Sequence, residues 1–179
     1  GASFTNPSIT TDFAESLVEM VTPVFTDVDE LYEYLLGLHV FIANSLEDDE
    51  LLWPLSMPPK IIDSSKINIA TYSDTNMGKL KHIYRKGLAL RYGKTMQCVS
   101  GIHYNFSLSD SSLSKIAKSN DQGDINNAYL GLIRNFKRLF WFVLSEFGHS
   151  SVVDKSFVSG RDNDLDLLKE LNTNYAQLG

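Results

Sequence analysis

The side chains best suited to chemistry are densest between Met96 and Leu108, where polar and apolar residues alternate. A period of two predicts a strand, because successive side chains point to opposite faces of a sheet. One predicted face carries uncharged hydrogen-bonding groups, an imidazole and a glycine; its members are Gln97, Val99, Gly101, His103, Asn105 and Ser107. Such a face is typical of a sheet that lines a ligand site. A half-exposed strand with a hydrogen-bonded histidine is the alternative.

Three acidic side chains near the start of the chain, Asp12, Glu15 and Glu19, are candidate ligands for a divalent cation. Carboxylate oxygens are the hard ligands that such cations favour, and a nearby histidine is compatible with them. The spacing over 12–22 fits both a helix and a strand, and Pro23 ends the segment in either case. A helix would place the three acids together. A solvated acidic surface is the plainer interpretation.

The segment Lys79–Lys94 is rich in basic residues, contains His82 and has no acid. This pattern indicates either a site for a small anion or an ordinary solvated face. Within the segment, Tyr84 and Arg85 could hold a substrate carboxylate, because a guanidinium can donate two parallel hydrogen bonds to it. A surface arginine is the commoner case. Arg134, in a later aromatic-rich segment, is expected to be structural.

The composition fits one ordinary domain of 179 residues, with 43% hydrophobic and 21% charged residues. It excludes a disordered chain, and the single cysteine, Cys98, excludes a disulfide scaffold and suggests the cytoplasm. The formal charge of −6 argues against a nucleic-acid partner. No apolar run approaches the roughly 20 residues that cross a bilayer, so no membrane partner is expected.

Two helices are predicted in the first half of the chain. Thr26 is expected to cap the first, whose apolar stripe comprises Leu31, Leu35, Leu38 and Ile42. The second is expected to start after Thr75-Asn76, to run to Tyr92 and to end at Gly93. Its predicted inward positions are Leu80, Ile83 or Tyr84, and Leu88. The three prolines of 53–59 predict an extended loop between these helices.

The second half of the chain predicts a serine-rich surface loop over 108–123 and then the strongest helix. This helix is expected to begin at Asp124 and to stop at Gly148. Its apolar face is broad and comprises Ile125, Tyr129, Leu132, Phe136, Leu139 or Phe140, and Val143. The last segment, 164–178, could form one short amphipathic helix.

Several motifs, in order and at matching intervals, resemble those of the proteobacterial glutamate–cysteine ligases. The early ones are Ile9-Thr10-Thr11-Asp12-Phe13-Ala14-Glu15, Glu19, Thr22-Pro23 and Trp53-Pro54-Leu55-Ser56-Met57-Pro58. The middle ones are Asn76-x-Gly78, Tyr84-Arg85-x-Gly87-Leu88, Arg91-Tyr92-Gly93 and Met96-Gln97. The most specific is Ser100-Gly101-Ile102-His103-Tyr104-Asn105-Phe106-Ser107. The likeness covers residues 1–160.

The resemblance implies an α+β fold of the glutamine synthetase-like superfamily, with an antiparallel catalytic sheet and helices packed outside it. Residues 1–160 would be a partial catalytic domain and 161–179 a tail. The implied reaction joins the γ-carboxyl of L-glutamate to the amine of L-cysteine through a γ-glutamyl phosphate, the first step of glutathione biosynthesis. It uses ATP as co-substrate and magnesium or manganese.

The resemblance also implies roles for individual residues. Asp12, Glu19 and His103 match metal-site residues, and Tyr84 and Arg85 match amino-acid substrate contacts. Gln97, Asn105 and Ser107 share the predicted strand face of His103 and are placed near the substrates on that ground.

The family has a Glu-x-Glu metal motif before this region and further cysteine and nucleotide residues after it, and neither is present here. Gly1 matches an internal position of the family. The chain is therefore expected to be a fragment that is inactive alone and whose partner is the remainder of the ligase. A non-catalytic truncated homologue, or a module that binds a small anion or an amino acid, is the alternative.

Overall fold

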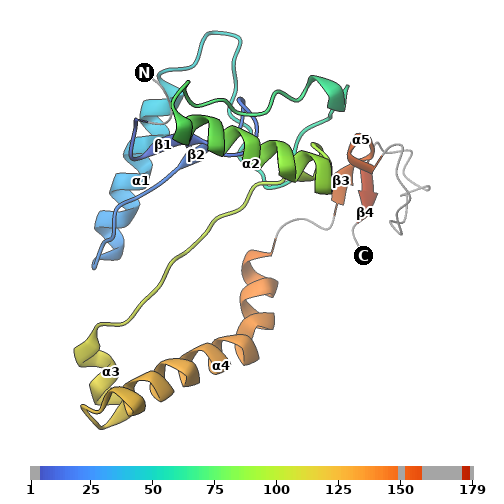
Figure 1. Cartoon of the computed structure of the whole chain (residues 1–179). Helices are drawn as coiled ribbons and strands as arrows, with labels where there is room; N and C mark the ends of the chain where they lie inside the picture. Colours follow the sequence, from blue (N-terminus) through green and yellow to red (C-terminus); the bar gives the residue numbers. More distant parts are fainter. Residues whose placement is uncertain (1–4, 149–151, 159–174, 178–179) are drawn as a thin grey trace. The chain divides into compact units, whose positions relative to one another are not determined.

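The computed structural model describes residues 5–148, 152–158 and 175–177, and it divides into two compact units (Figure 1). The first unit comprises 1–100 together with 151–179, and the second comprises 101–150. Each unit is described by itself below. No helix among the described residues has both the length and the apolar character needed to span a membrane.

The first unit begins with an antiparallel hairpin of β1 (Ile9–Thr11) and β2 (Val18–Met20). Thr10 lies opposite Glu19 in the register, and the Asp12 amide extends the pairing by donating to the Leu17 carbonyl over 2.9 Å. The ambiguous segment 12–22 is thus a turn followed by a strand, and the helical alternative is wrong. A proline that follows the strand has no amide hydrogen to continue the ladder.

Helix α1 (Val28–Ala43) is capped by Asp27, one residue later than predicted. The Asp27 carboxylate accepts hydrogen bonds from the amides of Asp29 (2.9 Å) and Glu30 (3.1 Å), as an N-cap side chain does. Asp27 therefore takes the position that was predicted for Thr26. The predicted apolar stripe is confirmed, since Ile42 is buried and its three other members are half-buried.

Helix α2 (Asn76–Tyr92) begins one residue earlier than predicted and ends where predicted, with Thr75 as N-cap and Gly93 as C-cap at a φ of 82°. The prediction of its inward face is wrong for Leu80 and for Ile83 or Tyr84, which are 59–65% exposed, whereas Leu88 is half-buried as predicted. The helix instead turns Gly78, His82 and Arg85 toward the body of the unit. The polar side chains of His82 and Arg85 on this packed side contact backbone carbonyls, as described below.

A small core lies where the hairpin turn meets the segment that precedes α2. Ala14 forms an isolated antiparallel bridge with Ile69, and the Ala70 amide donates to the Phe13 carbonyl over 2.9 Å. Phe13, Ala70 and Tyr72 are buried at this junction. The first strands and the start of α2 are therefore fixed to one another.

The first unit contains a second small core, built around β3 and α5. Strand β3 (Val152–Asp154) pairs with β4 (Tyr175–Gln177) and leads into the short α5 (Lys155–Val158). Val153 and Phe157 pack against partly buried residues of the middle of the chain, namely Met57, Ile61 and Val99. The proline-rich segment is a loop, as predicted, apart from the 3-10 turn η1 (Ser64–Lys66) that follows it.

The predicted strand over 96–108 does not form. Met96–Cys98 make a 3-10 turn, η2, and no regular structure follows until residue 110. A strand needs a pairing partner to be stable, and within the described ranges no segment pairs with 99–108. The alternating faces predicted for this segment are consequently not defined in this chain.

The second unit is a helical hairpin of α3 (Asp110–Ala117) and α4 (Gln122–Phe147). The predicted surface loop over 108–123 is wrong, because Ser109 caps α3 by accepting a 3.3 Å hydrogen bond from the Ser112 amide. Asp121 caps α4 in the same way, three residues before its predicted start. Leu113 of α3 is buried, and Ile125, Tyr129 and Leu132 of α4 are half-buried.

The predicted helix over 164–178 lies largely outside the described residues. The part that is described, Tyr175–Gln177, is strand β4. The resulting mixed architecture has α-helices and small antiparallel sheets, which agrees with the α+β class at that level.

Candidate functional site

The candidate site is organised around Tyr72, which lies just before α2. Its side chain is 5% exposed, and its hydroxyl donates to the backbone carbonyls of Thr11 (2.8 Å) and Asp12 (3.0 Å). A buried hydroxyl requires such partners. The tyrosine therefore holds the end of β1 at a fixed position relative to the N-terminal part of α2.

Asp12 and Glu19 are the two predicted metal-site acids of this unit. Glu19 lies opposite Thr10, and Asp12 is two residues beyond Thr10 on the paired backbone. This register puts both carboxylates on one face of the hairpin, as diagonal neighbours. Both side chains are exposed, so they can reach an ion or a ligand in solution.

Arg85, one of the predicted substrate contacts, packs on the same residues. Its guanidinium lies over the Tyr72 ring at 4.7 Å from the centroid, and its Nε donates to the Asp12 carbonyl. One terminal nitrogen also donates to the Lys81 carbonyl over 3.2 Å. Arg85 is thereby half-buried and positioned, with part of its donor set used by the backbone.

The electrostatics of Tyr72 reflect this arrangement. Burial raises the pKa of the phenol above its ordinary value of 10.0, and the negative charges of Asp12 and Glu19 act in the same direction. A hydrogen bond with the side chain of Thr11 and the charge of Arg85 oppose that rise. The charges of both carboxylates and of the guanidinium therefore act on the Tyr72 phenol, so the four groups lie close to one another.

Glu15, the third acid of the predicted cluster, makes structural hydrogen bonds. Its carboxylate accepts two 2.6 Å hydrogen bonds from Thr71, one from the amide and one from the hydroxyl. Glu15 therefore ties the hairpin turn to the segment before α2. The hypothesis of a three-acid cation cluster is not supported for this residue.

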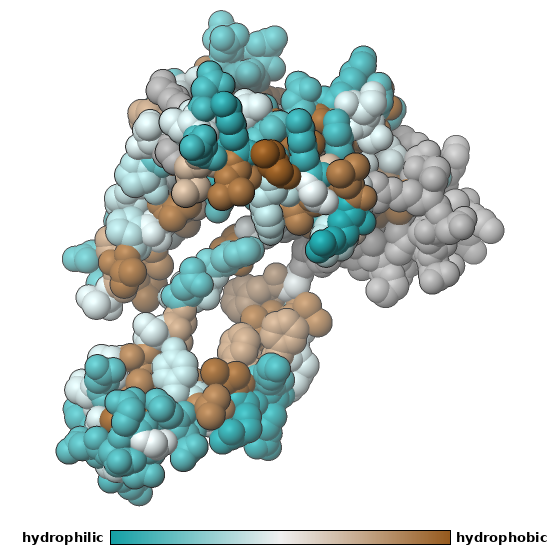
Figure 2. All heavy atoms as spheres, viewed as in Figure 1, coloured by the Kyte–Doolittle hydropathy of each residue, from teal (hydrophilic) through white to brown (hydrophobic). Residues whose placement is uncertain are grey.

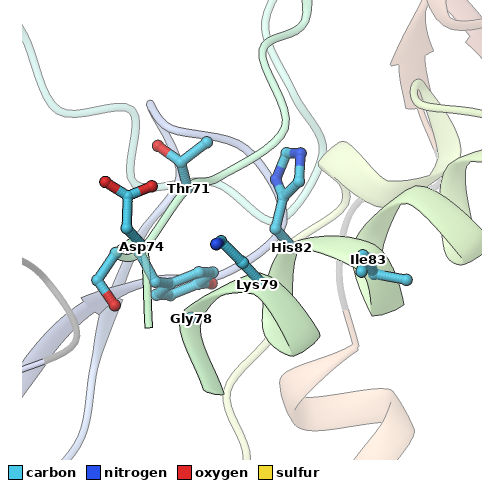
Figure 3. A pocket seen from close by; sticks show the side chains of 8 residues that line it. Thr71, Asp74, Gly78, Lys79, His82 and Ile83 are labelled. Atoms are coloured by element: carbon cyan, nitrogen blue, oxygen red, sulfur yellow. The ribbon is translucent and has the colours of Figure 1, made fainter. Parts of the chain in front are cut away.

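A hollow of about 420 Å³ lies beside the site, at the start of α2 (Figure 3). Asp74 and Lys79 contribute charged groups to its wall, and His82 contributes an imidazole whose Nδ1 lies 2.8 Å from the Ala70 carbonyl oxygen. Gly78 allows the close approach of α2 to Ser73 at the base of this wall. Sequence reasoning missed this hollow, because the only one of its lining residues that belongs to a quoted motif is Gly78, which has no side chain to suggest a site.

The other predicted substrate contacts are not gathered at Tyr72. Tyr84 is 65% exposed on the outer side of α2, and Gln97 is half-buried in η2. His103, Asn105 and Ser107 are exposed in the second unit. The convergence of His103 with Asp12 and Glu19 stays a prediction.

The donor set of the hairpin fits a divalent cation in part. Among the described residues, no group of three or more His, Cys, Asp or Glu side chains is arranged to hold a metal. Asp12 and Glu19 offer hard oxygen ligands on one face, which suits Mg²⁺ or Mn²⁺. They can supply part of a coordination shell, and further ligands have to come from elsewhere.

Tyr72 is the functional neighbour that sequence reasoning missed. It lies outside the motifs that carry the resemblance, and a lone tyrosine between polar residues has no periodic signal. The two carbonyls that it contacts are backbone groups, which composition and spacing do not reveal.

Comparisons with known proteins place this chain in a family. The family model "Glutamate-cysteine ligase" matches residues 1–178. The chain therefore belongs to the glutamate–cysteine ligase family, as the motifs indicated.

Individual relatives agree with that assignment. The glutamate–cysteine ligase of Pseudomonas putida (strain W619) is 47% identical over 173 residues, which are 94% of this chain and 33% of that protein. The ligase of Pseudomonas syringae pv. syringae is 44% identical over 180 residues, covering 98% of this chain and 34% of that protein. The chain thus spans about one third of the length of these curated relatives.

A solved structure supports the same fold. The glutamate–cysteine ligase of Francisella tularensis, crystallised in complex with AMP, matches with a TM-score of 0.86 and 34% sequence identity. The match covers 99% of this chain and 34% of that chain. The architecture of the 179 residues is accordingly that of a portion of a larger ligase fold.

Proposed function

We propose that this chain forms one wall of the active site of a glutamate–cysteine ligase. The reaction joins the γ-carboxyl of L-glutamate to the amine of L-cysteine at the expense of ATP. The γ-phosphoryl group of ATP passes to the glutamate carboxylate, and the cysteine amine then displaces phosphate from the acyl phosphate. In this proposal the chain acts in the cytoplasm, in glutathione biosynthesis.

The observation that carries the proposal is the grouping of Asp12, Glu19 and Arg85 around Tyr72. Two exposed carboxylates beside a positioned guanidinium suit a reaction in which anionic substrates meet a divalent cation. In such phosphoryl transfers, catalysis rests largely on positioning and on neutralising charge. The Francisella relative, crystallised with AMP, supports a nucleotide as one substrate.

The roles proposed for the residues follow the family pattern. Asp12, Glu19 and His103 would hold magnesium or manganese, which when bound would neutralise the charge on the phosphates. Tyr84 and Arg85 would contact an amino-acid substrate, and Arg85 is held for this by Tyr72 and by the Asp12 carbonyl. Gln97, Asn105 and Ser107 would lie near the substrates.

The wall is only part of a site, because the chain spans one third of the length of its relatives and its described residues hold no group of three or more side chains arranged to bind a metal. In this proposal residues 1–160 belong to a partial catalytic domain of glutamine synthetase-like architecture, and 161–179 form its tail. The isolated chain is accordingly expected to have no ligase activity. A non-catalytic module that binds a small anion or an amino acid is the second candidate, and the hollow at the start of α2 favours it.

A chimera tests the proposal. The matched third of the Pseudomonas putida ligase is replaced by this chain, and γ-glutamylcysteine formation is measured from ATP, glutamate and cysteine. We expect turnover in the chimera and none in the 179-residue chain. Asp12→Asn and Glu19→Gln should each lower kcat by tenfold or more, since each 1.4 kcal/mol of lost transition-state stabilisation is about tenfold in rate.

The matched control is Asp29→Asn, which removes an exposed carboxylate from α1, away from the hairpin face. It should leave kcat within twofold of the chimera. A folded chimera that is inactive, or one that tolerates both hairpin substitutions, would contradict the proposed function. Binding of glutamate or phosphate to the isolated chain together with an inactive chimera would favour the second candidate.

A further inference from the structure

The second half of helix α4 carries large apolar side chains on every side. Residues 139–144 are six consecutive apolar residues, Leu-Phe-Trp-Phe-Val-Leu, and at 3.6 residues per turn they encircle the helix. Trp141 is 67% exposed and Phe147 is 81% exposed. Figure 2 shows brown, hydrophobic side chains gathered along this helix. A helix that is hydrophobic all round belongs in the core of a larger protein or in a membrane.

Helix α3 is too short to cover this part of α4. Its eight residues span roughly 12 Å, whereas the 26 residues of α4 span roughly 39 Å at 1.5 Å per residue. Three apolar positions of the first half of α4, Ile125, Tyr129 and Leu132, are half-buried, whereas in the second half only Val143 is. Beyond them, Phe136, Leu139 and Phe140 are exposed.

The exposed apolar area is as large as the largest apolar patch of an ordinary soluble monomer, and such patches are often functional. Five aromatic side chains of this half are each about half exposed or more; they are Phe136, Phe140, Trp141, Phe142 and Phe147. Because a buried aromatic side chain removes about 150–250 Å² from water, these rings alone present on the order of 500 Å². Leu139 and Leu144 add to the same surface. Patches of this size mark a surface that is covered by a partner.

We infer that the apolar side chains of residues 136–147 of α4 belong to the core of the complete enzyme, enclosed by the polypeptide that makes up the other two thirds of a glutamate–cysteine ligase. The occupant follows from length: the relatives that match this chain along 94–98% of its residues are about three times as long. A membrane is not chosen as the occupant, since no described helix has the length and apolar character of a membrane span. This inference rests on the proposed function for the identity of the occupant.

Hydroxyl-radical footprinting with mass spectrometry measures the enclosure directly. Oxidation rates of Trp141 and Phe147 are compared between the 179-residue chain at low micromolar concentration and the same chain within the Pseudomonas putida chimera. Each rate is normalised to that of the denatured protein. We expect rates close to the denatured value in the isolated chain and at least fivefold lower rates in the chimera.

A pair of substitutions tests the energetic consequence. Trp141→Glu should leave the thermal midpoint of the isolated chain unchanged within 2 °C, because the ring is exposed there. In the chimera it should lower the midpoint by more than 5 °C or abolish soluble expression. Asn135→Glu adds the same charge at an exposed polar position of α4 and should be neutral in both proteins.

The other occupants are distinct outcomes. Protection of Trp141 in the monomeric isolated chain would overturn the inference, because the chain itself would then cover the helix. Protection that appears only with a dimer in light scattering would overturn it in favour of a second copy. An active chimera with Trp141 still freely oxidised would also overturn it, whereas an inactive chimera with Trp141 protected would support it and contradict only the proposed function.

Discussion

The Tyr72 hydroxyl and the Asp12 carbonyl are 3.0 Å apart, and this hydrogen bond joins the hairpin that carries the candidate acids to the segment that begins α2. The same carbonyl accepts a hydrogen bond from Arg85. A single backbone oxygen thereby connects the metal-site candidate on the hairpin to the substrate-contact candidate on the helix. The geometry of the site depends on this connection.

Tyr72→Phe should destabilise the chain by about 1–2 kcal/mol, because it removes a buried donor and leaves the Thr11 carbonyl without its phenolic partner. The ring remains under the Arg85 guanidinium, so the loss reports the hydroxyl alone. Urea denaturation followed by far-UV circular dichroism gives the free energy of unfolding. Tyr32→Phe, at a 61% exposed position of α1, is the control and should change it by less than about 0.5 kcal/mol. Equal effects of the two substitutions would contradict the structural part given to Tyr72.

The raised pKa of Tyr72 predicts an alkaline loss of stability. The folded chain keeps this proton at a pH where the unfolded chain, with a pKa near 10.0, has released it. The unfolded state then binds fewer protons, so the free energy of unfolding falls as pH rises. The contribution is fully present below the unfolded value and is lost as pH rises through the folded one.

Denaturation at pH 8 to 11 should therefore show a steeper decline for the natural chain than for Tyr72→Phe. Tyr32→Phe should follow the natural chain across the whole range. Parallel curves for the natural chain and Tyr72→Phe would show that the phenol titrates alike in both states, and the burial argument would fail.

The bounds of the helices were easier to predict from the sequence than the faces that they bury. The bounds of α2 follow from local signals, Thr75 as a cap and Gly93 at a positive φ, and such signals act within a few residues. Its inward face does not, because His82 and Arg85 are drawn inward by the carbonyls of Ala70 and Asp12, which lie elsewhere in the chain. Periodicity records apolar burial and carries no information about distant backbone acceptors.

The candidate site was predictable as a set of residues but not as an arrangement. The motifs select Asp12, Glu19 and Arg85, and the structure groups these three through Tyr72, which no motif selects. The predicted strand that carries His103 shows that a local pattern does not suffice to predict a strand. Alternation can predict a strand, but the strand needs a partner, and no described segment of this chain pairs with it.

Gly78 and Gly87, both in α2, make a matched pair for testing the contact between the helix and Ser73. A Cβ at position 78 would lie 2.8 Å from the Ser73 nitrogen and 2.5 Å from its carbonyl oxygen, whereas at position 87 it would meet nothing within 4 Å. Gly78→Ala should therefore destabilise by about 1–3 kcal/mol, as overpacking does. Gly87→Ala should stabilise by up to about 1 kcal/mol, because alanine favours the helix interior. Thermal unfolding of the two variants decides the matter, and a destabilisation of the same size at both positions would contradict the close approach.

Cys98 should react slowly with thiol reagents in the folded chain. Burial raises the pKa of its thiol, so less of the reactive thiolate is present at neutral pH. The sulfur, at the end of η2, also donates a 3.4 Å hydrogen bond to the Lys94 carbonyl, and that bond favours the thiol form. Alkylation by iodoacetamide at pH 7.5, followed by intact mass, should be severalfold slower for the native chain than for the same chain in urea. Raising the pH should increase the native rate beyond the pH at which the denatured rate has levelled, because a raised pKa moves the titration of the thiol to higher pH.

Cys98→Ser should take up no label and sets the background. A native rate equal to the denatured rate at pH 7.5 would mean that the thiol is neither buried nor shifted.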